Sequence, residues 1–358
     1  MDDNVYYKLF FIFIFLLNIH LSISALFFTF PISTTLTNGN IFVIHQNGIS
    51  VCNSGVTKII KNSYTFNEDE KISKDILVNV TITQFNDGFI IALIKDKLYF
   101  FDSNGDYLDK SENFLSHSNV YISISSYKTK SNRYYFFLIG YIYNKLLYLY
   151  YYKYDSQEKA ISTVATATGL YDKYGSSTYN IENNGVACKI VYKNSKDIIE
   201  CVYFMKKSSS YSYVSLALLY INNQNILTYK NTIHYEYKNI MFLSSAVNND
   251  FSQAFYCFYD IAGTTTCKYY DHLNDKGLVW TLNEKCSINN YGINTYYFPD
   301  TEEFSISCLL SKGGIGFVFF NKKIEQVTRY EYKYTDCTQI ISHSLLYSIN
   351  KEKFYVLS

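Results

Sequence analysis

The sequence has no excess of charge of either sign. It contains 32 Lys and Arg against 31 Asp and Glu, for a net charge of +1, and no long run of like charge. Proteins that bind nucleic acid or an anionic membrane surface concentrate basic residues on one face or in one tail. Composition therefore gives no support to either kind of partner.

Proline, tryptophan and arginine are also scarce. The 358 residues include 2 Pro, 1 Trp and, at Arg133 and Arg329, two arginines, whereas Tyr (39) and Phe (27) are abundant. Aromatic residues suit a pleated, half-buried surface. A bias toward A/T-rich codons is the alternative explanation, and it fits the excess of Lys over Arg. Tyrosine content alone is therefore weak evidence for a binding surface.

Sequence motifs of the common catalytic and metal sites are missing. No G-x-S-x-G elbow, P-loop or G-x-G-x-x-G follows a predicted strand. No C-x-x-C occurs, which excludes a zinc ribbon and a thioredoxin-like redox motif. The six histidines are scattered, without the spacing of metal ligands: His20, His45, His117, His234, His272 and His343. We therefore predict no catalytic residue, no metal site and no cofactor.

The N-terminus resembles a secretory signal peptide. An apolar run, Leu9–Leu17, follows a polar start, and Ser22 and Ser24 stand where a signal peptidase prefers small residues. We expect residues 1–24 to be removed and residues 25–358 to face the exterior or a secretory lumen. The alternative is an uncleaved signal anchor, which would be the chain's only contact with a membrane.

A second apolar stretch, Tyr134–Tyr154, is rich in tyrosine and has Asn144-Lys145 in its middle. Tyrosine prefers the membrane interface to the hydrocarbon centre. The stretch therefore predicts two strands joined by a turn rather than a membrane span.

Internal repetition is the strongest signal in the sequence. Residues 38–54 align without gaps to residues 87–103, at an offset of 49. Each segment has a turn with glycine, an apolar strand, a short polar turn and a second strand. Asn47-Gly48 and Asp87-Gly88 predict tight turns, since type I′ turns need positive φ at both central residues.

Further strand pairs follow with looser spacing: Tyr134–Ile139 with Leu146–Tyr151, Ile198–Phe204 with Tyr213–Ile221, Ala254–Asp260 with Thr266–Asp271, Glu302–Leu310 with Gly314–Asn321, and a last strand in residues 351–358. About seven strand-rich units with almost no helical periodicity resemble the repeats of β-propellers, in spacing and strand order alone. The resemblance implies an all-β fold of about six to seven blades. Tandem β-sandwiches that part near Tyr171–Asn184 are the alternative.

The last unit is incomplete, because Ser358 falls in what should be its second strand. Propellers often close by pairing an N-terminal strand with the last blade, and Leu26–Phe30 could serve. The alternative is that the natural protein is longer.

Eight cysteines in an exported chain predict disulfides. Their spacing favours Cys188 with Cys201, Cys257 with Cys267, and Cys286 with Cys308. Cys52 and Cys337 remain, and their pairing would link the first unit to the last. Some buried, unpaired cysteines are the alternative.

Other candidate sites have simpler explanations. Asp102–Asp106 (DSNGD) resembles the start of a calcium loop but lacks the later glutamate, and a type I turn explains it. Asn79 begins an N-x-S/T sequon, which either carries a glycan or belongs to a strand. A propeller hydrolase would need two converging carboxylates, and turn or strand-end roles are the simpler interpretation of the available ones: Asp260, Asp271, Asp300, Glu302 and Glu303.

Three functions remain open. The leading hypothesis is an extracellular or cell-surface, non-enzymatic binding or adhesion module whose partner is a protein or a glycan. The second is a secreted carbohydrate-active hydrolase, and the third is the truncated ectodomain of a membrane receptor.

Overall fold

The computed structural model describes most of the chain after residue 31. The described ranges are 32–53, 58–72, 80–111, 122–170, 180–193, 196–208, 211–221, 227–237, 240–260, 262–272, 276–285, 293–298, 301–310, 314–321, 326–332, 343–347 and 353–357. The predicted signal segment, the strand Leu26–Phe30 and the sequon residue Asn79 lie outside these ranges.

The described residues form six four-stranded antiparallel sheets and one two-stranded sheet, which we call blades 1 to 7 in chain order. Blades 1 and 2 contain β1 (Ile32–Thr35), β2 (Ile41–His45), β3 (Gly48–Cys52), β4 (Ile59–Thr65), β5 (Val80–Gln84), β6 (Ile90–Ile94), β7 (Lys97–Phe101) and β8 (Tyr107–Ser111). Blades 3 and 4 contain β9 (Ile122–Lys130), β10 (Tyr134–Tyr143), β11 (Leu146–Asp155), β12 (Ala160–Leu170), β13 (Asn180–Lys193), β14 (Lys196–Ser208), β15 (Tyr211–Ile221) and β16 (Leu227–Tyr237). Blades 5 to 7 contain β17 (Ile240–Val247), β18 (Gln253–Asp260), β19 (Thr264–Asp271), β20 (Lys276–Lys285), β21 (Ile293–Phe298), β22 (Glu303–Leu309), β23 (Ile315–Phe320), β24 (Gln326–Tyr332), β25 (His343–Tyr347) and β26 (Lys353–Leu357).

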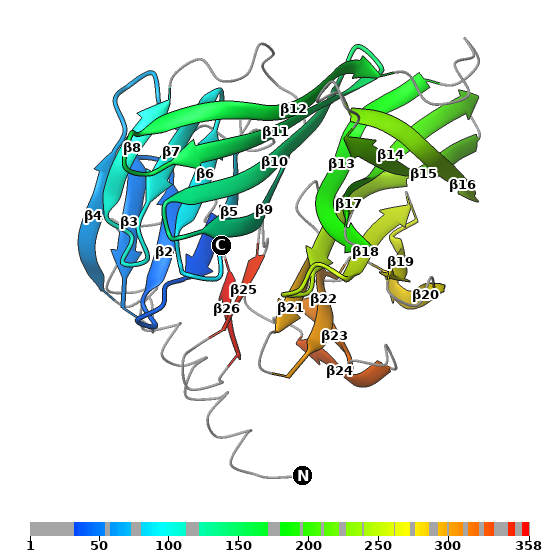
Figure 1. The fold of residues 1–358 in the computed structure, drawn as a ribbon. Coiled ribbons are helices and arrows are strands. Elements are labelled where there is room, and N and C mark those ends of the chain that lie inside the picture. The colour runs from blue at the N-terminus through cyan, green and yellow to red at the C-terminus, as the bar shows by residue number, and fades with distance from the viewer. Residues whose placement is uncertain are drawn as a thin grey trace.

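The first strands of the seven blades form a closed ring. Each of β1, β5, β9, β13, β17 and β21 contacts the first strand of the next blade, and β25 contacts both β21 and β1. Figure 1 shows β25 and β26, in red, near the middle of the molecule. The fold is a β-propeller, as the repeats predicted, and the alternative of tandem sandwiches is wrong.

The strands β2, β3, β6 and β7 are buried along almost their whole length. Both faces of a blade pack against its neighbours, and hydrophobic clusters fill the spaces between successive blades from 1 to 6. Each fully buried Val, Leu, Ile or Phe side chain contributes about 1.5–3 kcal/mol. This double burial explains why the middle strands are continuous apolar runs rather than alternating ones.

The 49-residue repeat is exact in the structure, since β2 and β3 are equivalent to β6 and β7. The turn before β6 differs from the predicted type. Phe85 O accepts the Gly88 N–H at 2.9 Å, and φ is positive at Gly88 (90°) but not at Asp87. This is a type I turn followed by a glycine bulge rather than a type I′ turn.

The prediction of a type I′ turn at Asn47-Gly48 is also wrong. Gly48 already pairs with His45 in the hairpin, so Gln46 and Asn47 form the turn, and neither has positive φ. A type I′ turn occurs instead at Asn144-Lys145, where φ is 48° and 65°.

That turn joins β10 to β11, so the apolar stretch Tyr134–Tyr154 is a hairpin, as predicted. In the part of the chain that the structure describes, no helix is long and apolar enough to cross a membrane.

Disulfides join Cys188 to Cys201 across β13 and β14, and Cys257 to Cys267 across β18 and β19. In both pairs the cysteines lie directly opposite each other, with Cα atoms 4.1 Å apart. These are two of the pairs that the spacing favoured. Cys308 is also disulfide-bonded, and Cys286 lies outside the described residues.

The predicted Cys52–Cys337 disulfide is not supported, because Cys52 is a free thiol. Cys52 ends β3 and lies in the core of blade 1, 1% exposed. The thiol is therefore shielded from solvent. Cys337 lies outside the described residues.

Candidate functional site

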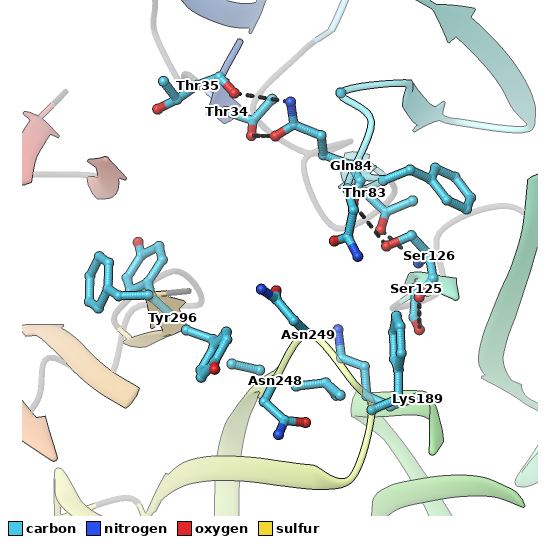
Figure 2. Close-up of a pocket in the computed structure, with 18 of the residues that line it drawn as sticks. Thr34, Thr35, Thr83, Gln84, Ser125, Ser126, Lys189, Asn248, Asn249 and Tyr296 are labelled. Carbon is cyan, nitrogen blue, oxygen red and sulfur yellow. Dashed lines mark hydrogen bonds between the residues drawn. The ribbon is translucent and has the colours of Figure 1, made fainter. Parts of the chain in front are cut away.

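A cavity of about 770 Å³ lies inside the ring of first strands. Its wall comes from β1, β5, β9, β13, β17 and β21 and from the turns that follow β1, β5 and β17. Figure 2 shows the labelled side chains arranged around this open centre. Binding sites for small ligands are concave and commonly occupy about 300–1,000 Å³, so the cavity is large enough for one.

The part of the wall that the described residues form is polar but almost uncharged. Its polar lining residues are Ser33, Thr34, Thr35, Thr37, Thr83, Gln84, Asn86, Ser125, Ser126, Lys189, Asn248, Asn249, Thr295, Tyr296 and Tyr297. Lys189 is the one charged side chain among the described residues that line the cavity. The aromatic residues of β21, Tyr296 to Phe298, form part of the same wall.

Hydrogen bonds between neighbouring first strands fix much of this wall. Thr34 Oγ1 donates to Gln84 Oε1 at 2.7 Å, and Gln84 Nε2 donates to Thr35 O at 3.0 Å. One blade further on, Ser126 N donates to Thr83 Oγ1 at 2.7 Å. These bonds hold β1, β5 and β9 together, and Figure 2 shows them.

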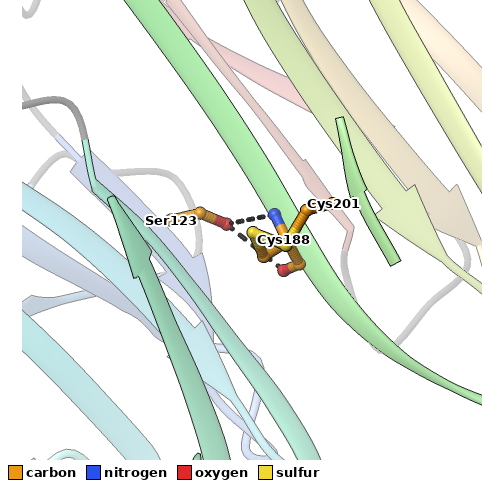
Figure 3. The surroundings of a disulfide bond; sticks show 3 residues. All are labelled: Ser123, Cys188 and Cys201. Carbon is orange, nitrogen blue, oxygen red and sulfur yellow. Dashed lines mark hydrogen bonds between the residues drawn. A yellow bond between two sulfur atoms is a disulfide. The ribbon is translucent and has the colours of Figure 1, made fainter. Parts of the chain in front are cut away.

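The same pattern continues around the ring. Ser123 Oγ on β9 accepts the Cys188 N–H at 3.0 Å and donates to Cys188 O at 3.3 Å, as Figure 3 shows. Ser244 on β17 accepts the Thr295 N–H of β21 at 3.0 Å. These polar residues of the first strands therefore have a structural function, since they link each strand of the ring to the next.

Lys189 and Asn249 extend into the open centre (Figure 2). Asn249 is exposed and Lys189 is half-buried. Within the described residues, neither side chain has a hydrogen-bond partner, so both can bind a ligand. Burial lowers the pKa of Lys189 to about 8, because the ammonium group loses contact with bulk water.

Glu200, the residue opposite Lys189 on β14, does not neutralise it. Glu200 is fully buried, and its Oε2 lies 2.7 Å from His272 Nε2. Burial lowers the pKa of the neighbouring Lys268 to about 7, and the charge of Glu200 partly opposes that change. This buried group of side chains joins blade 4 to blade 5 and lies beside the cavity rather than in its lining.

The histidines do not gather in one place. His45 is bonded to Ser50 Oγ at 2.9 Å, and burial lowers its pKa to about 4. His272 belongs to the buried group with Glu200. His234 and His343 fall in β16 and β25, whereas His20 and His117 lie outside the described residues.

None of the described carboxylates considered for a hydrolase is among the residues that line the cavity. Asp260 Oδ1 accepts the backbone N–H groups of Ala262 and Thr264 in the turn between β18 and β19. Asp271 ends β19, Glu302 and Glu303 begin the β22 hairpin, and Asp300 lies outside the described residues.

Asp102 also has a turn role. Its Oδ1 accepts the backbone N–H groups of Asn104 at 2.9 Å and of Asp106 at 2.8 Å. Among the described residues, no three His, Cys, Asp or Glu side chains gather in the way that metal ligands do.

Sequence reasoning missed the cavity residues. Thr34, Gln84 and Lys189 lie on the first strands of blades 1, 2 and 4, yet no short motif marks them. The signal that could have found them is polarity in the strand that precedes each apolar pair.

Comparison with known proteins places the fold but no family. No protein-family model matches the chain, and no curated protein is similar to it in sequence. Its structure resembles the BP39L lectin from Burkholderia pseudomallei, with a TM-score of 0.53, 9% identity and coverage of 93% of this chain and 97% of that one. It also resembles the polysaccharide lyase Uly1, with a TM-score of 0.51, 10% identity and coverage of 91% and 85%.

Proposed function

We propose that this chain is an exported, non-enzymatic β-propeller that binds a glycan in its central cavity. The observation that carries the proposal is the wall: hydroxyl, amide and aromatic side chains around about 770 Å³, with a single charged group among the described lining residues. Sugar hydroxyls are both donors and acceptors, and such side chains match them. The flat apolar face of a sugar ring packs well against an aromatic ring.

Two of the structures that share this fold are a lectin and a polysaccharide lyase. At 9% and 10% identity they support the scaffold rather than the ligand. The residues of this chain's own cavity supply the argument for a carbohydrate site here.

The hydrolase alternative is less well supported by the cavity. Glycoside hydrolysis ordinarily requires two carboxyl groups that flank the scissile bond. The described lining residues include no Asp or Glu, and Asp260 already accepts two backbone hydrogen bonds in its own turn. Binding without turnover is the function that this wall favours.

Export is the second half of the proposal. The signal-like segment 1–24 and the two disulfides between described cysteines both fit an oxidising compartment. The receptor-ectodomain alternative shares this location and differs only in what would follow the propeller.

The test is a glycan array probed with the purified full chain, followed by titration calorimetry with the best ligand. Tyr296→Ala combined with Asn249→Ala should lower affinity at least about 10-fold, because it removes a wall aromatic and an exposed amide. Tyr220→Ala is the matched control, since Tyr220 is 44% exposed on β15 and does not line the cavity. Binding to no glycan, or equal binding by both variants, would overturn the proposal.

A further inference from the structure

Lys189 is the one charged side chain among the described residues that line the cavity. It lies on the first strand of blade 4, and its ammonium group reaches the space that the hydroxyl and amide side chains surround. A half-buried charge is costly unless an opposite charge approaches it. The described lining residues provide no carboxylate to do so.

The carboxylate opposite Lys189 on β14 already has another partner. Glu200 faces Lys189 across β13 and β14, but it lies 2.7 Å from His272 and interacts electrostatically with Lys268 and Tyr256. Glu200 therefore balances the buried groups of blades 4 and 5, and the charge of Lys189 is left for a ligand.

We propose that the glycan of the central cavity is acidic, and that its carboxylate or sulfate group pairs with Lys189. This inference rests on the proposed function and names the class of sugar that the same site takes. The remaining hydroxyl groups of that sugar bind Asn249 and the neutral wall. One cation in the described lining indicates one acidic group per bound unit rather than a densely sulfated chain.

The surrounding geometry favours a fixed, selective contact. Lys189 lies within β13, directly after Cys188. Cys188 is disulfide-bonded to Cys201 on one side and hydrogen-bonded to Ser123 on the other. Its backbone is therefore held on both sides of the sheet. A charge on a fixed backbone discriminates between ligands better than a charge on a mobile loop, because less ordering is required on binding.

The experiment uses a glycan array that contains matched sets: a neutral oligosaccharide, its uronic-acid counterpart and its sulfate ester. The purified full chain should bind at least one acidic member about 10-fold or more tightly than its neutral counterpart, the size expected of a charge-assisted hydrogen bond. Comparison of the two acidic members distinguishes carboxylate from sulfate as the source of the charge. Raising the salt concentration should reduce the preference.

Lys189→Met removes the charge at similar length and should abolish the preference, whereas Lys189→Arg should retain it. Lys58→Met is the matched control, because Lys58 is exposed in blade 1 and outside the cavity. Thermal unfolding of each variant establishes that it is folded. Equal binding of neutral and acidic members, or a preference that survives Lys189→Met, would overturn this inference while the glycan-binding function stands. Failure of every glycan to bind would instead overturn the proposed function.

Discussion

Gly140 on β10 faces the Cys188–Cys201 disulfide of the next blade, and a Cβ atom added to Gly140 would lie 2.6 Å from Cys188 Sγ. That is far closer than two packed, non-bonded atoms approach each other. The hydrogen bonds between Ser123 on β9 and the backbone of Cys188 on β13 join the same two blades (Figure 3). Blades 3 and 4 therefore meet where one blade has no side chain and the other has its disulfide.

Replacement of Gly140 by alanine is expected to lower the free energy of unfolding by about 1–3 kcal/mol, the usual cost of an overpacked core. In a background that carries Cys188→Ala and Cys201→Ala, the cost should shrink, since the sulfur atom that clashes is gone. Denaturant unfolding of the four proteins forms a double-mutant cycle. Gly277→Ala is the control, because the atoms that its added Cβ would meet all belong to Tyr270 and include no sulfur. If the costs of Gly140→Ala and of the two cysteine replacements simply add, the contact between position 140 and the disulfide is disproved.

Glu70 is a buried carboxylate that joins blades 1 and 2. It accepts hydrogen bonds from Lys110 Nζ at 2.9 Å and from Tyr99 OH at 3.2 Å, and it is 1% exposed. Burial alone would raise its pKa, but the hydrogen bonds from Lys110 and the Asn67 N–H lower the pKa to about 2. Because the folded-state pKa is below the ordinary value of 4.5, Glu70 stabilises the protein above that pH. The contribution is lost as pH falls from 4.5 toward 2.

Glu70→Gln should therefore lower the free energy of unfolding at pH 7 by about 2–4 kcal/mol, because Lys110 and Lys97 both lose the buried carboxylate with which they pair. The variant should also lose stability less steeply than the parent between pH 4.5 and pH 2. Thermal unfolding across that range measures both effects. Glu68→Gln is the control, since Glu68 is 89% exposed and such surface ion pairs contribute about 0–1 kcal/mol. A Glu70 variant that behaves like the Glu68 variant would disprove the role of this carboxylate.

The middle strands of the blades could be predicted from the sequence, and the reason is their double burial. Strands such as Ile90–Ile94 are apolar at every position, so a run of five such residues next to a turn is a reliable signal. The turn types were less predictable. Asp87-Gly88 fits two kinds of turn in sequence, and the hydrogen bond between Phe85 O and Gly88 N distinguishes them only in the folded chain.

The cavity could not be predicted, because its residues are distant in sequence and ordinary in type. Thr34 and Gln84 are 50 residues apart, and their side chains meet only because β1 and β5 lie side by side in the ring. In the sequence, Lys189 has no adjacent acidic residue and no glycine-rich loop to mark it. Its position becomes informative only when the wall around it is seen to be neutral.

Cys52 was expected to form a disulfide with Cys337, whereas the structure has a buried thiol there. Burial raises the pKa of Cys52 to about 11, so very little thiolate forms near neutral pH. Iodoacetamide at pH 8 should leave Cys52 unmodified in the native protein and should modify it in denaturant without a reducing agent. Peptide mapping by mass spectrometry reads both states. The peptides of Cys188 and Cys201 should stay linked throughout, and a Cys52 peptide linked to any other cysteine would disprove the free thiol.

Lys189 should give ligand binding a pH dependence of known sign. Its pKa is lowered from 10.5 to about 8 by burial, and the other titratable groups that line the described cavity are the phenols of Tyr296 and Tyr297. Burial and the nearby acids Glu302 and Asp250 raise the pKa of Tyr297, so that phenol stays neutral in the same range. The preference for an acidic over a neutral glycan should therefore be full at pH 7 and should fall as pH rises past about 8.

In the absence of ligand, the stability of the protein should rise with pH, whereas the binding preference falls. Between about pH 8 and pH 10.5 the unfolded chain holds a proton on Lys189 that the folded chain has released, so the free energy of unfolding rises with pH. Lys268, with a pKa of about 7, also makes the free energy of unfolding rise with pH, and its contribution begins at a lower pH than that of Lys189. The difference between the parent and Lys189→Met isolates the contribution of Lys189. An acidic ligand favours the charged lysine and should therefore raise its pKa and move the fall in binding to higher pH. If titration calorimetry from pH 7 to pH 9.5 finds the same preference throughout, and Lys189→Met leaves it unchanged, then Lys189 does not contact the ligand.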